Sequence, residues 1–258
     1  MADAFFIPDG DGRFTATEHT GGPWDPQLQH GGPPAALLTR CLDALPGLEG
    51  TIARISVDII GPVPVGPVEV AARVERPGRS VELLVAELFA GGRVAVRASA
   101  WRIRAAALTL PAGAGEPLVP APPFPLADSA LTATWPGGFL QAMQWRVVAG
   151  DWSELGPATI WGRMRLPLVA NEPTSSLSRV MVLADCGNGA SATLPHGGWL
   201  FINPDLTVHF ARPPSGEWFC LSAATAVDAR GFGLARSEIF ATDGLVARGA
   251  QSLYVAPR

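Results

Sequence analysis

Three polar side chains in this sequence interrupt stretches that are otherwise apolar. Asp185 ends the run "RVMVLAD", Gln251 lies in the alternating segment "ARGAQSLYV", and His30 stands in "QHGGPPAALLTR". A carboxylate or an amide among buried residues has to be paired, hydrated or functional, and a histidine is a common general base. We therefore take these three residues as the first candidates for a functional site.

The glycines that follow the histidine are candidates of another kind. Gly31 and Gly32 stand immediately before two prolines and an apolar run with helical spacing. Backbone N–H groups at a helix start can polarise a carbonyl or hold an oxyanion, although a tight turn has the same letters. His30 has no carboxylate near it in the sequence, so we interpret it as a structural or ring-stacking side chain beside the glycines.

Each polar candidate also has a plain structural interpretation. Asp185 can reach solvent from the end of its helix, and Gln251 can lie on the exposed face of a strand. Asn203, a further candidate, precedes Pro204, where an asparagine often serves only turn chemistry.

Several chemistries are excluded by residues that the chain lacks. It contains no lysine, which excludes a Schiff base and a P-loop lysine, and no GxSxG elbow. Its three cysteines form no CxxC pair, so neither a zinc site nor a disulfide framework is indicated. The letters "DGDG" lack the remaining ligands of a calcium loop. We expect no metal and no cofactor.

Charge and hydropathy set further limits. The chain of 258 residues has a formal net charge of −4 and no basic run, which argues against nucleic acid as a partner. It shows no signal-peptide pattern and no apolar run near the length of about 18 residues that a spanning helix needs. We expect a protein without membrane segments, with reduced thiols, in the cytoplasm.

An Ala- and Pro-rich stretch divides the chain into similar halves. Residues 109–130 are expected to form an extended linker between residues 1–108 and 131–258. Both halves show the same order of strands and turns. The expected strands cover 51–61, 68–76, 81–89 and 93–103 in the first half. In the second half the corresponding segments are 205–216, which includes the turn that follows the strand, then 217–227, 233–240 and 245–255.

The halves superpose at an almost constant offset, which is 151 between Pro62 and Pro213 and 152 between Gly92 and Gly244. An apolar, helix-length segment precedes each meander, at 33–45 and 173–187, and each begins near a proline. A helix that buries its apolar face on a curved sheet gives a two-layer α+β unit. Pairing two such units edge to edge removes an open edge from each. The sequence thus predicts an internal duplication and a fused pseudo-dimer.

Four stretches in this order carry a family resemblance: "HGG" before the first helix, "DLTVHFARP", "ARGFGLARSEIFATDGLVA" and "GAQSLYV". The chain resembles the hotdog fold in its double form and is similar to the bacterial type II acyl-CoA thioesterases. The resemblance covers nearly the whole chain. It implies a tandem (double) hotdog of the α+β class, with two antiparallel sheets that are each wrapped on a central helix.

The resemblance also implies roles for the candidates. In these thioesterases an aspartate on the second helix activates water, and a hydroxyl residue and a glutamine hold that water. The aspartate falls on Asp185 and the glutamine on Gln251, but the hydroxyl position falls on Asn203, which departs from the family pattern. The helix-start glycine of one unit faces the acid of the other, so Gly31 is expected opposite Asp185. At an offset of 146, Thr39 stands where the second half has its acid.

The expected function is hydrolysis of a fatty or related acyl-CoA to the free acid and CoA. Two alternatives stay open, a non-catalytic acyl-thioester binding protein and a hotdog enoyl-CoA hydratase or dehydratase. "INPDLTVH" resembles the hydratase signature, but Phe201 and Leu206 stand where that signature has aspartate and histidine. "PHGGW" repeats the HGG letters after the second helix, where we expect a turn. The resemblance further allows a homodimer of double-hotdog units.

Overall fold

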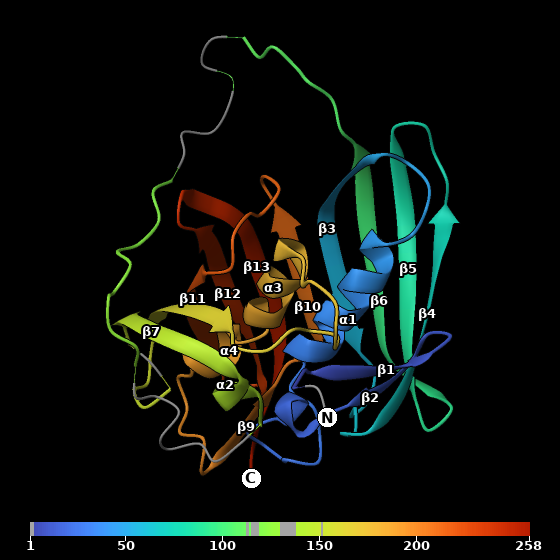
Figure 1. Ribbon diagram of the computed structural model, residues 1–258. Helices are drawn as coiled ribbons and strands as arrows, with labels where there is room; N and C mark the ends of the chain where they lie inside the picture. The colour runs from blue at the N-terminus through green and yellow to red at the C-terminus, as the bar shows by residue number, and fades with distance from the viewer. Residues whose placement is uncertain (1–2, 112–113, 115–118, 130–137, 151) are drawn as a thin grey trace.

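The computed structural model describes residues 3–111, 114, 119–129, 138–150 and 152–258 (Figure 1). The first part of the chain forms β1 (Phe6–Gly10), β2 (Arg13–Ala16), α1 (Gly32–Asp43), β3 (Gly50–Ile59), β4 (Pro67–Arg76), β5 (Val81–Ala90) and β6 (Arg93–Arg104). The later part forms α2 (Gly138–Ala142), β7 (Met143–Ala149), β8 (Ala158–Met164), α3 (Ser176–Ala184), α4 (Gly187–Ala190), β9 (Trp199–Ile202), β10 (Asp205–Phe210), β11 (Phe219–Asp228), β12 (Phe232–Ala241) and β13 (Gly244–Pro257).

All strands within the described residues belong to one antiparallel sheet. Its order is β1-β2-β4-β5-β6-β3-β10-β13-β12-β11-β8-β7, and β9 pairs with the end of β13. Counted outward from the centre, β3-β6-β5-β4 on one side repeats as β10-β13-β12-β11 on the other. The two sheets that the sequence predicts are thus joined into a single one.

The central pair, β3 and β10, joins the two halves edge to edge, as the repeat predicts. Ser56 lies directly opposite Thr207 in this antiparallel pair. These residues are 151 positions apart, which is the offset at which the two halves superpose. Residues that are equivalent by sequence therefore face each other at the centre of the sheet.

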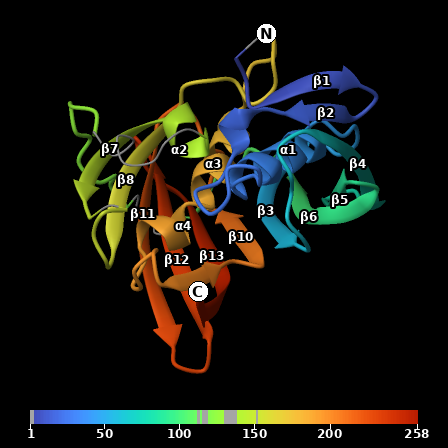
Figure 2. The ribbon, with the colours of Figure 1, turned by 90° about the horizontal axis from the view of Figure 1, so that it is seen from below.

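Helices α1 and α3 pack against each other on the concave side of the sheet (Figure 2). Pro33 and Pro34 occupy the first turn of α1, where a missing N–H is harmless. Helix α3 begins at a Ser175 cap, whose hydroxyl accepts from the Ser178 N–H. The apolar residues of α1 that are almost fully buried are Ala35, Ala36, Leu37, Leu38 and Leu42. Their burial and that of the α3 face hold both helices on the sheet.

A hairpin that the periodicity does not predict extends each half of the sheet, β1–β2 beside β4 and β7–β8 beside β11. The letters "DGDG" form the first hairpin's turn, with positive φ at Gly10, Asp11 and Gly12. Asp-Gly between short extended segments is a recognised hairpin signal. The strands themselves are too short and irregular to show a clear alternation.

The chain between β6 and α2 forms no helix or strand in the part that the structure describes. Residues 119–129 nevertheless pack against the second half. The Phe124 ring meets Trp161 and Trp218 edge-on, with ring centroids 5.0 and 5.3 Å away. Trp161 donates its indole N–H to the Pro123 carbonyl. We call this segment the strap. Within the described ranges, no helix is long and apolar enough to cross a membrane.

Candidate active site

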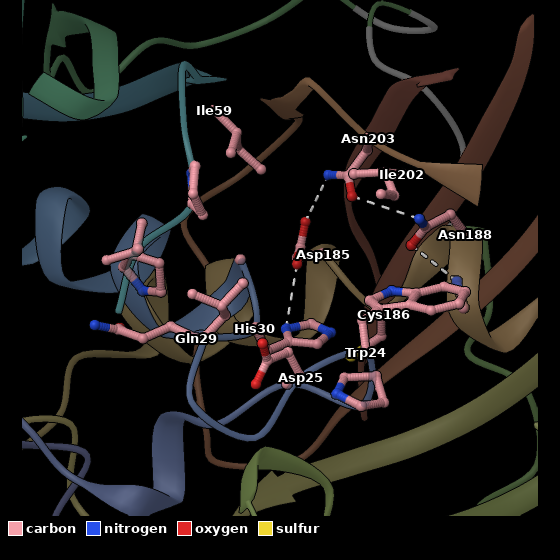
Figure 3. Close-up of a pocket in the computed structure, with 18 of the residues that line it drawn as sticks. Trp24, Asp25, Gln29, His30, Ile59, Asp185, Cys186, Asn188, Ile202 and Asn203 are labelled. Atoms are coloured by element: carbon pink, nitrogen blue, oxygen red, sulfur yellow. Dashed lines mark hydrogen bonds and ion pairs between the residues drawn. The ribbon is translucent and has the colours of Figure 1, made fainter. Parts of the chain in front are cut away.

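A cavity of about 440 Å³ opens where the loop before α1 meets the end of α3 (Figure 3). His30, Gly31, Asp185 and Asn203 line it, whereas Gly32 and Gln251 are not among its lining residues. Most of the remaining wall is apolar or aromatic, with contributions from Trp24, Leu28, Pro34, Ile59, Val63, Val96, Leu140, Trp152, Ile202 and Tyr254. The two halves of the chain therefore build one cavity together.

The two glycines allow the loop and α3 to approach each other closely. A Cβ atom on Gly31 would lie 2.6 Å from Oδ2 of Asp185, and one on Gly32 would lie 2.5 Å from the Val182 carbonyl oxygen. Neither glycine has a positive φ. Glycine is therefore required here by close packing, and Gly31 faces Asp185 as the resemblance implies.

Asp185 is the residue that ends α3, and only 4% of its surface is exposed. Its Oδ1 accepts hydrogen bonds from Asn203 Nδ2 at 2.8 Å and from Gln251 Nε2 at 3.2 Å. The resemblance implies that the side chains at these two positions hold a water molecule. In the structure they donate to the carboxylate itself, and Gln251 does so without lining the cavity.

Asn188, which the sequence analysis did not single out, connects the two amides. Its backbone N–H donates to Gln251 Oε1 at 3.1 Å, and its side-chain amide donates to Asn203 Oδ1 at 3.4 Å and to the Phe201 carbonyl at 3.1 Å. These bonds fix which end of each amide faces Asp185. The only sequence signal for this residue is an asparagine three positions after the acid, in "DCGN".

His30 contacts the carboxylate from the other half of the chain. Its Nδ1 lies 3.2 Å from Oδ2 of Asp185, and the Gly32 N–H donates to the same nitrogen at 3.1 Å. The ring stacks on Phe139 of α2, with centroids 4.1 Å apart and planes at 12°. The expected ring stacking is thus present. A carboxylate does lie beside His30 in the fold, although none is near it in the sequence.

Burial moves both titratable groups toward their neutral forms. It raises the pKa of the Asp185 carboxyl, and the contacts from His30, the two amides and the Gly32 N–H lower it without reversing that shift. Burial lowers the pKa of His30, which the Asp185 charge raises in part. Burial also raises the pKa of the neighbouring Cys186 thiol well above its usual value, so this thiol stays protonated.

The other sequence features lie at or near the site in different ways. "PHGGW" forms a turn, as expected, with the Gly198 N–H donating to the Pro195 carbonyl, yet His196 lines the cavity. The three cysteines are free. Among the residues that the structure describes, no group of three or more His, Cys, Asp or Glu side chains could hold a metal ion.

Sequence profiles of one family match both halves. The acyl-CoA thioesterase N-terminal domain matches residues 20–103, and the acyl-CoA thioesterase C-terminal domain matches residues 117–255. No curated protein matches the sequence.

Solved structures with a hotdog fold or a thioesterase description are similar over nearly the whole chain. A hotdog-fold protein of unknown function from Alicyclobacillus acidocaldarius is 20% identical, with a TM-score of 0.72 over 97% of this chain and 95% of that one. The acyl-CoA thioesterase II TesB2 from Mycobacterium marinum is 17% identical, with a TM-score of 0.65 over 98% and 95%. The tesB protein of Mycobacterium avium subspecies paratuberculosis is 17% identical, with a TM-score of 0.67 over 98% and 96%. At these identities the likeness shows a fold of the hotdog type.

Proposed function

Because the chain belongs to the acyl-CoA thioesterase family, we propose that it hydrolyses a fatty or related acyl-CoA with a water molecule that Asp185 activates. It is a thioester hydrolase, and acyl-CoA is the substrate class that its two domains imply. The observation that carries the mechanism is a buried carboxylate that faces a largely apolar cavity, with two amide donors on one of its oxygens.

The proposed reaction begins when Asp185 takes a proton from water and the water oxygen bonds to the thioester carbonyl carbon. The carbonyl π electrons move to oxygen and give a tetrahedral oxyanion. When this intermediate collapses, the C=O bond forms again and the C–S bond breaks. The leaving thiolate takes the proton from Asp185, which releases the free acid and CoA. The carboxylate is then ready for another cycle.

Gly31 is the better placed of the two glycines to hold the oxyanion. It lines the cavity, and its N–H donates to no group in the described part of the chain. The Gly32 N–H is already directed at His30 Nδ1 and at the Asp185 carboxylate. We therefore assign the carbonyl contact to Gly31 and a supporting role to Gly32.

Asn203 takes the place of the family's hydroxyl residue. Its amide nitrogen donates to Asp185 Oδ1 and to the Asp205 carbonyl, so it favours the ionised carboxylate and keeps that side chain in one place. An amide can do this as a hydroxyl can. Gln251 adds the second donor and anchors the carboxylate to β13.

The same proposal includes a tandem hotdog architecture, with a unit at residues 1–108, a linker at 109–130 and a unit at 131–258. The repeated strand order and the placement of α1 and α3 on the concave face support it. In this arrangement each unit contributes one end of its helix to a shared site. The apolar wall of the cavity would hold the acyl group.

The test measures thiol release by the full chain from acyl-CoAs with short, medium and long acyl chains, beside Asp185→Asn. We expect release by the wild type and a loss of at least about 100-fold in the variant, the usual contribution of a general base. Release that survives unchanged in Asp185→Asn contradicts the mechanism. Binding without release favours the binding protein, and a hydrated or conjugated thioester as product favours the hydratase.

A further inference from the structure

The candidate base and the histidine beside it come from different halves of the chain. His30 precedes α1 and Asp185 follows α3, and only 14% and 5% of their side-chain surfaces are exposed. The 3.2 Å between His30 Nδ1 and Asp185 Oδ2 is short for two bare lone pairs. A proton between the two atoms turns this contact into a hydrogen bond.

The imidazole ring is held on several sides. Phe139 stacks on one face at 4.1 Å, and the Gly32 N–H meets the Nδ1 edge. The missing side chain of Gly31 makes the room in which the carboxylate approaches the loop. A ring fixed in this way presents one nitrogen to one oxygen, which is the preorganisation that an active site requires.

The two carboxylate oxygens face different groups. Oδ1 accepts from the amides of Asn203 and Gln251, which both belong to the second half, whereas Oδ2 faces His30 of the first half. Figure 3 shows Asp185 between Asn203 on one side and His30 on the other. The orientation of the carboxylate is therefore set from both halves at once.

We propose that His30 is a positioning residue whose Nδ1–H donates to Oδ2 of Asp185, which keeps the carboxylate ionised and oriented toward the water. With the proton on Nδ1 this nitrogen accepts no hydrogen bond, and the Gly32 N–H, which lies 3.1 Å from Nδ1, donates to the Asp185 carboxylate instead. This inference rests on the proposed function, in which Asp185 is the base. His30 acts through Asp185 and forms no bond with the substrate. The histidine of the "HGG" motif thereby becomes part of the machinery whose acid lies in the other half.

Among the titratable groups that line the cavity, His30 is the one that we assign to orienting Asp185. The other titratable groups that line the cavity are Asp25, Cys186, His196 and Tyr254, and none of its described lining residues is an arginine. Helix α2, which supplies Phe139 to the stack on the imidazole ring, contains no titratable residue. Burial favours the neutral forms of both partners, whereas each partner favours the charged form of the other. The Asp185 charge raises the pKa of His30, and the His30 charge lowers the pKa of Asp185.

The first experiment compares two variants of the full chain. His30→Asn keeps a side-chain donor near the Nδ1 position, whereas His30→Phe keeps a ring for the Phe139 stack without a nitrogen. We expect His30→Phe to lose about 10- to 100-fold in kcat/KM, as fits the loss of one hydrogen bond to a charged group, and to move the acid limb of the pH profile upward. His30→Asn is expected to recover most of the loss. His209→Asn, at an exposed histidine of β10, is the matched control and keeps the wild-type profile.

Equal losses in both His30 variants, with unchanged acid limbs and lowered melting temperatures, would overturn the proposal in favour of a purely structural histidine. A second measurement does not depend on hydrolysis. The chain has four histidines, so the imidazole NMR signal of His30 is identified by its loss in His30→Asn. We expect the pKa of His30 to fall when Asp185 is replaced by Asn. An identical titration in the wild type and Asp185→Asn overturns the pairing, whereas coupled titration in a protein that releases no thiol counts against the hydrolase mechanism alone.

Discussion

The Thr207 hydroxyl donates a 3.1 Å hydrogen bond to the Ser56 hydroxyl across the central strand pair. The two residues are equivalent in the repeat, so each half meets its counterpart at this point. The bond is half-buried and lies on the face of the sheet opposite to the helices, because the neighbouring Ile55, Val57, Leu206 and Val208 are buried. It ties together the two strands on whose pairing the continuous sheet depends.

Thr207→Val removes one partner of this bond, and Ser56→Ala removes the other. Each is expected to lower the free energy of unfolding by about 0.5–1.5 kcal/mol, the usual net contribution of a hydrogen bond. The double variant is expected to lose less than the sum of the two. Chemical denaturation of all four proteins gives the coupling energy, and strict additivity would contradict the bond.

Gly31→Ala tests the close approach of the loop to the acid. The new Cβ would lie 2.6 Å from Asp185 Oδ2, so the carboxylate has to move. A displacement near 1 Å can cost about 100-fold in rate, and we expect a loss of that order in kcat. Gly197→Ala is the matched control, because this glycine also follows a histidine in an HGG sequence and has no atom within 4 Å of its Cβ position. Equal activities of the two variants would contradict the prediction.

Asn203→Asp places a second carboxylate beside the first with little change of shape. The distance between them would be close to the 2.8 Å of the present hydrogen bond. Like charges at this distance raise the pKa of one member of the pair. The acid limb of kcat/KM is therefore expected at higher pH in the variant than in the wild type. A pH profile that coincides with that of the wild type would show that Asn203 does not contact the base.

Asp185→Asn is expected to stabilise the fold while it removes activity. Folding raises the pKa of Asp185, so the native state binds this proton more tightly than the unfolded chain does. Wild-type stability then falls as pH rises from the ordinary aspartate pKa through the raised one, and the asparagine variant escapes that loss. We expect a gain of about 0.5–2 kcal/mol at neutral pH.

The pH dependence of the melting temperature checks the sign of this effect. The gain of Asp185→Asn over the wild type is expected to vanish at low pH. Asp243→Asn is a control of opposite sign, because its hydrogen bond with Arg212 lowers the pKa of Asp243. A variant at Asp185 that is less stable than the wild type at neutral pH would contradict the prediction.

Phe124→Ala tests whether the strap contributes to the stability of the second half. The ring lies between Trp161 and Trp218 and under the Arg146 guanidinium, which is 4.7 Å from its centroid. Although 38% of this residue is exposed, its loss is expected to cost about 1–3 kcal/mol, because the contacts with both tryptophans and the arginine are lost with the ring. Leu126→Ala, at a side chain of the same segment that is 91% exposed, is expected to have no effect in the same thermal unfolding assay. Equal stability of both variants would show that the strap only covers the sheet.

The long strands and both main helices were predictable because each has a clear apolar period. Turns separate the strands, and a proline lies near the start of each helix. Helix 33–45 lies at Gly32–Asp43, and the expected 173–187 helix begins later and ends at Ala184, where Asp185 closes it. The two hairpins and β9 were not predicted, since short strands carry too few residues for an alternation to show.

Most residues of the candidate site could be named from the sequence, but their contacts could not. The resemblance located Asp185, Asn203, Gln251 and the two glycines, and the structure brings all of them together. It could not reveal that His30 touches Asp185, because the two are 155 positions apart and meet only through the packing of α1 on α3. For Asn188 the sequence offers only its place three positions after the acid, because its role depends on the contacts that it makes with Gln251 and Asn203 in the folded chain.

Helix α1 carries Thr39 where the sequence repeat would place a second acid, and its buried hydroxyl donates to the Ala35 carbonyl inside its own helix. In the proposed tandem arrangement one half therefore supplies the glycine loop and the histidine, and the other supplies the carboxylate. Such halves made as separate polypeptides would also form like-with-like pairs, with two acids or with none. Covalent fusion fixes the stoichiometry, so that every folded chain holds one complete set of complementary parts.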